Sequence, residues 1–391
     1  MKLSKKKLLV FINLIFFFLI ILFINSQSLK NRIKILKDDM IEKYHAFKFK
    51  NNQIKIGHKY YNLQKIDLPP EFNLFPVGYV EAKNDIVYLV SGTREFYYYD
   101  NKNQKISPIK NNLKKFHNIK SKDYWIESNI RDSLILDNAI YLTLNSCENI
   151  DNKFFCKMVL VTSNLSTQEL IFKPIFETKK VLTDIDFTHS GGRVSNYKKN
   201  KILIAIPDYG HPYEALEINS YYGKIIEFDI LNFEKSIFSF GHRNPQGLYY
   251  DPSRDIVLES EHGPGNGDEI NLVKKNGNYG WPNYSYGAAQ GIETILDNNH
   301  AINGAVEPLK YFKSSIGPSQ ISKSLNDDEY VMASLRGFNG KKLFSFKITD
   351  TSYEIKDFSY FYVGDRIRDI VNYKNKLYMI LENSKQLVIV N

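Results

Sequence analysis

Cysteine is nearly absent from this sequence, with only two in 391 residues, Cys147 and Cys156. A cysteine-based metal site needs more ligands than this pair supplies, which excludes such a centre. In an exported protein, two cysteines flanking a short polar loop between two apparent strands favour a disulfide across a hairpin. Two unrelated thiols are the alternative.

The body of the chain also lacks an excess of positive charge. The formal net charge is +9, but residues 1–60 alone carry +10, so the remaining 331 residues sum to −1. A nearly neutral body has no basic surface of the kind that phosphate backbones require. Nucleic-acid binding is therefore excluded as the expected function.

A third feature that is missing is an Ala-x-Ala cleavage site after the apolar N-terminus. Lys5–Lys7 precede an apolar run, Leu8–Ile24, which is interrupted only by Asn13. The flanking lysines and this length favour an uncleaved single-pass anchor over residues 8–25, with 1–7 in the cytoplasm and the body in the periplasm. The alternative is a signal peptide that is removed on export.

Residues 26–60 form a basic segment between this anchor and the body. Its apolar residues follow a helical spacing, which predicts an amphipathic stalk that could also lie on anionic lipid. These residues are Ile33, Leu36, Met40, Ile41 and Tyr44. The body then comprises residues 61–391, whose many Tyr and Phe residues favour strands.

An internal repeat organises the body. Residues 130–144 and 367–381 align without gaps, with 6 identities in 15 positions. Each copy has an apolar strand, a two-residue polar turn and a second apolar strand, which predicts a β-hairpin.

The second strand of this hairpin recurs six times, at intervals of 47 to 74 residues. The strand centres are Tyr88, Tyr141, Leu203, Val257, Val331 and Tyr378. Periods near 50 residues with several strands each indicate an all-β, six-bladed β-propeller with roughly 55 residues per blade. A β-sandwich is the alternative, but it does not explain the repeat.

Unusual polar residues gather where the first strand of a hairpin begins and where the second strand ends. Both places lie on the same face of a propeller, so these side chains should converge at one mouth of the central channel. Those before strands are Arg131, His189, Asn244 and Arg368, and those after strands are Asp208, Gly263, Pro264 and Arg336.

Several motifs occur in a distinctive order. They are HSGGR from His189, FGHRNPQGLYY from Phe240, EHGPGNGDEINLVKKNGNYGWP from Glu261, GPS from Gly317, SLR from Ser334 and DRIRD from Asp365. In this order, over residues 185–391, they resemble the soluble glucose dehydrogenase and aldose sugar dehydrogenase family, whose cofactor is PQQ.

The resemblance implies a set of cofactor-binding residues. PQQ carries carboxylates, and Arg243, Arg366 and Arg368 are the cations expected to bind them. Arg336 and Asn244 are expected near the quinone oxygens. For Arg366 and Arg368 the alternative is local pairing with the aspartates that flank them.

Calcium is the second implied cofactor, because Ca²⁺ binds oxygen ligands and polarises a carbonyl as a Lewis acid. By resemblance, the carbonyls of Gly263 and Pro264 hold the cofactor-linked ion. Glu269 and the backbone of Tyr279 resemble a second, structural calcium site. The alternative is an ordinary glycine-rich turn with solvated acids.

His189 matches the family's general base, which removes the hydroxyl proton of the sugar. The chain departs from the family in two places: Arg336 stands where a lysine is usual, and residues 127–131 replace a segment with a glutamine near the quinone. Arginine and lysine are not interchangeable at a tight site, so these departures bear directly on cofactor binding.

The expected function is thus oxidation of an aldose sugar to its lactone at the periplasmic face, with electrons passed to a membrane acceptor. One alternative is a catalytically silent propeller that binds glycans or protein partners. Another is a calcium-dependent lactonase, which the cluster of arginines argues against because axial calcium needs carboxylate and amide ligands.

Overall fold

The structure of the chain is a computed structural model that describes residues 30–72, 78–116, 129–183, 189, 191–288, 300–335 and 340–391. The chain divides into two compact units, residues 1–51 and 52–391. The described part of the first unit is a helix over residues 30–50, within the segment expected to form a stalk. Along the described ranges, no helix is long and apolar enough to span a membrane. The anchor expected over 8–25 lies outside these ranges.

The helix over 30–50 is amphipathic, as its sequence predicts. Several of its apolar side chains are exposed, each with about half or more of its surface accessible. They are Ile33, Leu36, Met40, Tyr44 and Phe47, which share one face by their helical spacing, and Ile35, which lies on the opposite face.

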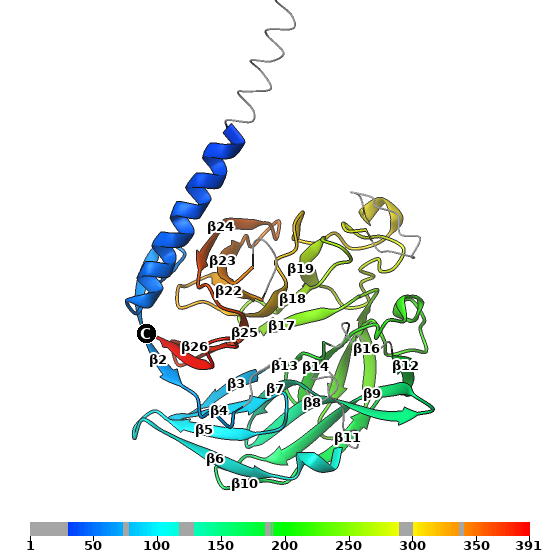
Figure 1. The fold of residues 1–391 in the computed structure, drawn as a ribbon. Coiled ribbons are helices and arrows are strands. Elements are labelled where there is room, and N and C mark those ends of the chain that lie inside the picture. The colour runs from blue at the N-terminus through cyan, green and yellow to red at the C-terminus, as the bar shows by residue number, and fades with distance from the viewer. Residues whose placement is uncertain are drawn as a thin grey trace, which may run out of the picture. The chain divides into compact units, whose positions relative to one another are not determined.

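Residues 52–391 form six sheets, which are the blades of a β-propeller (Figure 1). The first blade contains β3 (Gly78–Lys83), β4 (Ile86–Ser91), β5 (Phe96–Asp100) and β6 (Lys105–Asn111), with the short β10 (Glu169–Leu170) at its edge. The second contains β7 (Ile130–Leu136), β8 (Ala139–Ile150), β9 (Lys153–Asn164), β11 (Lys173–Glu177) and β12 (Val181–Thr183). The third contains β13 (Val194–Tyr197), β14 (Lys201–Ile206), β15 (Lys224–Asp229) and β16 (Lys235–Phe240).

The remaining blades follow the same antiparallel order. The fourth contains β17 (Pro245–Asp251), β18 (Ile256–Glu261), β19 (Asp268–Val273) and β20 (Lys310–Phe312). The fifth contains β21 (Pro318–Lys323), β22 (Glu329–Ser334), β23 (Lys342–Ile348) and β24 (Ile355–Tyr362). The sixth contains β25 (Ile367–Tyr373), β26 (Lys376–Leu381), β27 (Gln386–Val390), β2 (Lys59–Asp67) and β1 (Gln53–Ile56). Short 3₁₀ helices occur at Leu113–Phe116, Pro212–Ala215 and His300–Asn303.

The ring of blades is closed by strands from both ends of the propeller. The first strands of consecutive blades contact one another all the way round, from β3 through β7, β13, β17, β21 and β25 back to β3. In the sixth blade, β2 pairs with β27 from Leu63↔Val390 to Asp67↔Gln386. The propeller sheets therefore begin at Gln53, earlier than the boundary at residue 61 expected from the sequence. The sixth blade is thus completed by β1 and β2, which come from the opposite end of the propeller sequence.

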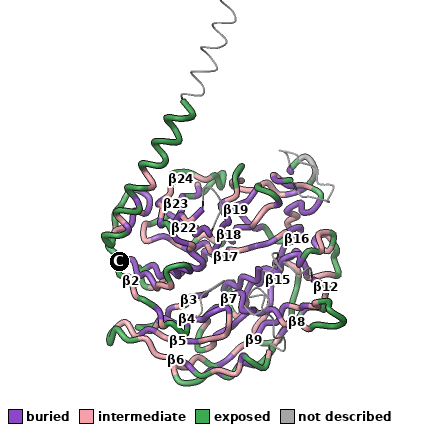
Figure 2. The backbone as a smooth tube through the Cα atoms, in the orientation of Figure 1, coloured by how far each residue is buried: buried purple, intermediate pink, exposed green. Residues whose placement is uncertain are grey.

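The predicted repeat is confirmed. Residues 130–144 fall on β7 and β8, and residues 367–381 on β25 and β26. All six predicted strand centres lie on the second strand of a blade, namely β4, β8, β14, β18, β22 and β26. The apolar side chains of these strands pack between neighbouring blades, and Figure 2 shows buried residues along the strands and exposed residues at the peripheral turns.

The predicted disulfide is also confirmed. Cys147 on β8 lies directly opposite Cys156 on β9 in the antiparallel register. Their Cα atoms are 4.1 Å apart and the two sulfur atoms are bonded. The hairpin brings the two cysteines together without help from the rest of the fold.

A candidate active site at one mouth of the propeller

His189 is held in position by a buried carboxylate. It precedes β13, and its Nδ1 lies 2.8 Å from Oδ1 of Asp208, which follows β14. Asp208 is fully buried, and its Oδ2 accepts a hydrogen bond of 2.8 Å from the indole of Trp281. The sequence placed Asp208 at this mouth but assigned it no role. Its partners fix the carboxylate, which in turn orients the imidazole.

Arg243 completes the surroundings of His189. Its NH2 group lies 2.5 Å from Nε2 of His189, and its NH1 group donates to the carbonyls of His262 (2.9 Å) and Gly263 (3.3 Å). The guanidinium carbon lies 5.3 Å from the ring centre of Trp281. Because arginine only donates, Nε2 of His189 is the acceptor and its Nδ1 carries the proton toward Asp208.

In the contacts above, the buried guanidinium of Arg243 donates to neutral acceptors, namely two backbone carbonyls and an imidazole. Its Nε is buried, and within the described ranges this atom has no hydrogen-bond partner. Burial lowers the pKa of Arg243, and the nearby charges of Asp208 and Glu261 oppose that shift. A buried cation with a spare donor suits an anionic ligand, since a carboxylate would satisfy both the charge and the donor.

Asn244 and the glycines after His189 hold two blades close together. The side-chain oxygen of Asn244 accepts from the backbone N–H of Gly191 (3.2 Å) and from the amide of Gln246 (2.9 Å). A Cβ at Gly191 would lie 2.1 Å from the carbonyl oxygen of Pro245. Only glycine permits this approach, because it has no Cβ.

Within the described ranges, no ion pair joins the side chains of Arg366 and Arg368 to the aspartates beside them. Both donate through Nε to the same carboxylate, Glu382, at 2.6 and 2.7 Å. Glu382 is buried and directly follows β26, and sequence reasoning missed it. Its position at the end of a second strand is the signal that would have indicated it.

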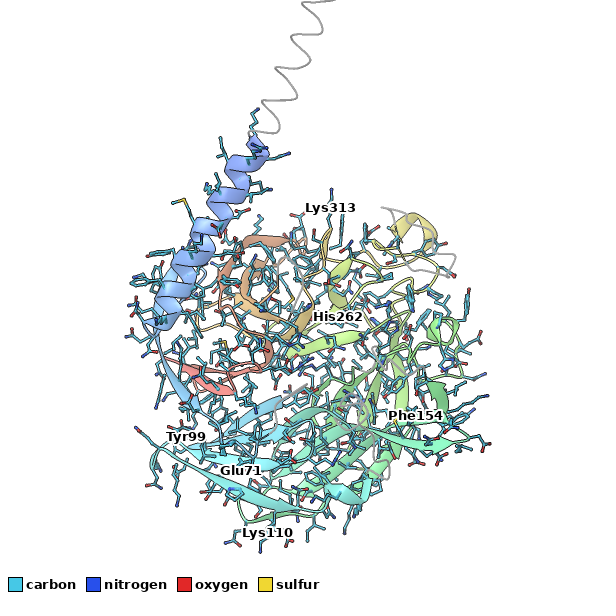
Figure 3. The ribbon with its side chains drawn as sticks, in the orientation of Figure 1. Glu71, Tyr99, Lys110, Phe154, His262 and Lys313 are labelled. Carbon is cyan, nitrogen blue, oxygen red and sulfur yellow. A yellow bond between two sulfur atoms is a disulfide. The ribbon has the colours of Figure 1, made fainter. Side chains whose placement is uncertain are left out.

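Arg368 nevertheless lies close to the residues around Arg243. Burial lowers the pKa of His262 to about 4, and the charges of Arg368 and Arg243 contribute. His262, which Figure 3 labels, donates through Nε2 to the carbonyl of Pro318 (2.9 Å). The structure thus brings His189, Arg243 and Arg368 to one mouth, while Arg336 lies outside the described residues.

The loop expected to supply calcium ligands is fixed by Asp268. Oδ1 of Asp268 accepts the backbone N–H of Gly263 at 3.1 Å, and its Oδ2 accepts the N–H groups of Ile316 and Gly317. The carbonyl of Gly263 faces Arg243, and Pro264 is buried beside it. The chain therefore presents backbone oxygens next to the guanidinium that would bind an anion.

Glu269 and Tyr279, the residues expected at a second calcium site, are both buried. Oε2 of Glu269 accepts a hydrogen bond of 3.3 Å from the amide of Asn271. Burial and the neighbouring carboxylate of Glu261 raise the pKa of Glu269 well above its usual value. An ionised Glu269 would need a cation here in addition to the donor of Asn271.

A second set of charges, the axial cluster of Arg193, Asp132 and Asp369, lies beside the site. NH1 of Arg193 donates to Asp132 (2.9 Å) and Asp369 (2.8 Å), its Nε to the carbonyl of Gln246 (2.6 Å) and its NH2 to that of Arg368 (2.9 Å). Burial opposes its charge, but the two aspartates raise the pKa of Arg193 above its usual value. The cluster ties together the first strands of several blades.

Comparison with known proteins places these features in context. The profile of the glucose / sorbosone dehydrogenase family matches residues 133–390. Aldose sugar dehydrogenase YliI of Escherichia coli is 31% identical over 141 residues, which is 32% of this chain and 38% of that protein. Quinoprotein glucose dehydrogenase B of Acinetobacter calcoaceticus is 40% identical over 88 residues, 19% of this chain and 18% of that protein.

These matched segments span less than two fifths of either relative. A crystal structure of a glucose dehydrogenase superposes with a TM-score of 0.67 at 19% identity, covering 84% of this chain and 99% of that one. At that identity the superposition establishes the shared fold.

Proposed function

Since the chain belongs to the glucose / sorbosone dehydrogenase family, we propose that it oxidises an aldose sugar to its lactone, with PQQ and Ca²⁺ as cofactors. The observation that carries the proposal is the joint presence of an oriented base and a buried cation. His189 bonds to Asp208 at 2.8 Å, and the buried Nε of Arg243 beside it has no hydrogen-bond partner among the described residues.

His189 acts as the general base through Nε2. Because Nδ1 carries a proton that is directed to Asp208, Nε2 has a free lone pair and accepts the hydroxyl proton of the sugar. Asp208 stabilises the imidazolium that results, and Trp281 keeps Asp208 in place. Protonation of His189 requires the donor of Arg243 to leave Nε2, since a protonated nitrogen has no lone pair to accept it.

The cations of this mouth bind the acidic groups of the cofactor. When bound, PQQ supplies an ortho-quinone that accepts the electrons released from the sugar carbon. Arg243 offers its buried Nε to a carboxylate, while Arg366 and Arg368, held rigid by Glu382, add positive charge. Asn244, and Arg336 beyond the described residues, complete the proposed binding set.

Calcium is proposed at two places. The carbonyls of Gly263 and Pro264 would hold the ion that assists the cofactor, because hard cations prefer oxygen ligands. Glu269 and the backbone of Tyr279 would hold a structural ion, which would compensate the buried charge of Glu269.

We also propose that residues 8–25 anchor the protein, with the propeller in the periplasm and a membrane component as electron acceptor. The Cys147–Cys156 disulfide supports this location, since structural disulfides persist in oxidising compartments. N-terminal sequencing of the mature protein tests the anchor. A mature chain that starts near Gln27 contradicts it.

Reconstitution tests the activity. The purified protein is incubated with PQQ and Ca²⁺, and reduction of a dye is followed when aldoses are added. His189→Ala should retain PQQ binding and lose about 10²- to 10⁴-fold in turnover, as is typical when a positioned base is removed. Arg243→Ala should instead weaken PQQ binding, because a carboxylate partner is lost.

His58→Ala is the matched control, since His58 is exposed in the turn between β1 and β2 and should leave turnover unchanged. Wild-type protein that does not bind PQQ would contradict the proposal and favour a binding propeller. Hydrolysis of lactones without PQQ would instead identify a lactonase. Full turnover by His189→Ala would refute the assignment of the base.

A further inference from the structure

Another group of buried polar residues lies next to the backbone of Arg243, whose N–H donates to Glu261. This inner cluster consists of His242, Glu259, Glu261 and Asn271, none with more than 4% of its surface exposed. Glu259 and Glu261 lie two residues apart on β18, so both point to the same face of the sheet. Asn271 is the register partner of Glu259 on the neighbouring strand β19.

Three atoms of the inner cluster lack any hydrogen-bond partner within the described part of the chain. They are Nδ1 of His242, Oε1 of Glu259 and Oδ1 of Asn271. Buried polar atoms are almost always paired, because each unpaired group loses its hydration without compensation. Three unpaired atoms in one small cluster indicate a missing ligand.

The remaining polar atoms of the cluster are already engaged and hold the ligand atoms in place. Nε2 of His242 bonds to the hydroxyl of Ser239 at 2.8 Å, and Oε2 of Glu259 accepts from Asn271 at 2.9 Å. Oε2 of Glu261 accepts the backbone N–H of Arg243 at 2.8 Å. Each side chain therefore has one atom anchored and one atom directed into the cluster.

We propose that the inner cluster binds a divalent transition-metal ion, such as Zn²⁺, Mn²⁺ or Co²⁺, through His242, Glu259 and Glu261. One nitrogen and two carboxylate oxygens from these residues lie within 4.8 Å of one another. Metal bonds of about 2.0–2.2 Å place two ligand atoms at most about 4.4 Å apart, so small side-chain rotations would close the site. Asn271 supplies a fourth ligand if its amide turns to present Oδ1.

The local charge also calls for a cation. Glu259, Glu261 and Glu269 lie together, since the side-chain amide of Asn271 donates to all three carboxylates at 2.9 to 3.5 Å, and ionised they would repel one another. Two neighbouring cations, Arg243 and Lys224, point elsewhere. The guanidinium of Arg243 faces His189, and the ammonium of Lys224 donates to backbone carbonyls, including that of Ala215 at 2.9 Å.

This site differs in chemistry from the calcium sites proposed above. A histidine nitrogen is a poor ligand for Ca²⁺ but a common ligand for transition metals. The cluster uses neither the carbonyls of Gly263 and Pro264 nor the backbone of Tyr279. Because Glu261 also accepts the N–H groups of Arg243 and Asn244, an ion here would stiffen the loop that presents both residues to the active site.

Titration of the full chain with Co²⁺ tests the proposal, without PQQ and without any sugar. After removal of metals with a chelator, wild-type protein should bind one additional Co²⁺ relative to Glu259→Gln and develop visible absorption bands of a mixed nitrogen and oxygen site. Excess Ca²⁺ should not displace this ion. Since no activity is measured, failure of the dehydrogenase proposal leaves the result unaffected.

Glu259→Gln is the decisive variant because Oε1 of Glu259 has no hydrogen-bond partner in the part of the chain that the structure describes, so its replacement breaks no described bond of that atom. Glu329→Gln is the matched control, a buried glutamate on β22 that bonds to Ser324 instead. It should bind Co²⁺ as wild type does. Equal binding by wild type and Glu259→Gln, or displacement by Ca²⁺, overturns the proposal, and so does wild-type protein that binds no Co²⁺.

Discussion

The axial cluster and the inner cluster are both buried and both charged, but their hydrogen bonding differs. In the axial cluster, Arg193 uses Nε, NH1 and NH2 on two carboxylates and two carbonyls. In the inner cluster, His242, Glu259 and Asn271 each keep one atom without a hydrogen-bond partner among the residues that the structure describes. The axial cluster contains an arginine that binds its carboxylates, whereas no lysine or arginine side chain of the described residues donates to the carboxylates of the inner cluster.

The difference separates a structural role from a binding role. The axial cluster reaches further blades through Asp369, whose Oδ2 accepts the N–H of Val80 on β3 at 2.9 Å, and through Ser319 on β21, which donates to the carbonyl of Arg368. With a cation of its own between the two carboxylates, it holds the blades around the axis. The inner cluster lacks this internal match, which is the property expected of a site that takes its cation from solution.

Removal of the axial cation should have the largest effect on stability. Arg193→Met leaves Asp132 and Asp369 buried without their partner, so the free energy of unfolding should fall by about 3–5 kcal/mol. Chemical denaturation followed by fluorescence measures this loss. Arg193→Lys keeps the positive charge but loses the branched set of donors, so its free energy of unfolding should lie between those of wild type and Arg193→Met. A change below about 0.5 kcal/mol for Arg193→Met would remove the structural role of the cluster.

Addition of a cation to the inner cluster should have the next largest effect. A ligand that binds only the folded state stabilises it by about 2.7 kcal/mol at a free concentration 100 times its Kd. Zn²⁺ or Mn²⁺ should therefore raise the melting temperature of chelator-treated wild type more than that of Glu259→Gln. Thermal unfolding followed by circular dichroism measures both. If the metal raised the melting temperatures of both proteins equally, the stabilising ion would bind outside the inner cluster.

The smallest effect on stability is expected when one carboxylate of the inner cluster is neutralised, compared with one carboxylate of the axial cluster. In metal-free protein, Glu259→Gln should change the free energy of unfolding by less than about 0.5 kcal/mol or increase it, because a repelling charge is removed. The matched Asp132→Asn should destabilise by about 1.5–3 kcal/mol, since it loses charge-assisted bonds to Arg193. Equal losses in the two variants would show that the clusters do not differ as proposed.

Local patterns in the sequence were sufficient to predict the blades. The hairpins over 130–144 and 367–381 depend on alternating apolar residues and short polar turns, which act within a few residues. The Cys147–Cys156 disulfide follows from one such hairpin. The convergence of His189 and Asp208 also follows, because equivalent ends of the blade strands meet at one mouth. Arg243 was expected at the site from the family resemblance alone.

Only the tertiary structure decided which charges pair. Arg193 joins Asp132 and Asp369, which are 61 and 176 residues away, and Arg366 and Arg368 take Glu382 instead of the aspartates beside them. The pairing of β2 with β27 and the meeting of His242 with Glu259 and Asn271 are equally remote from any local pattern. These contacts depend on how six blades close around an axis, and side chains adjacent in the sequence point to opposite faces of a strand, so spacing alone does not reveal them.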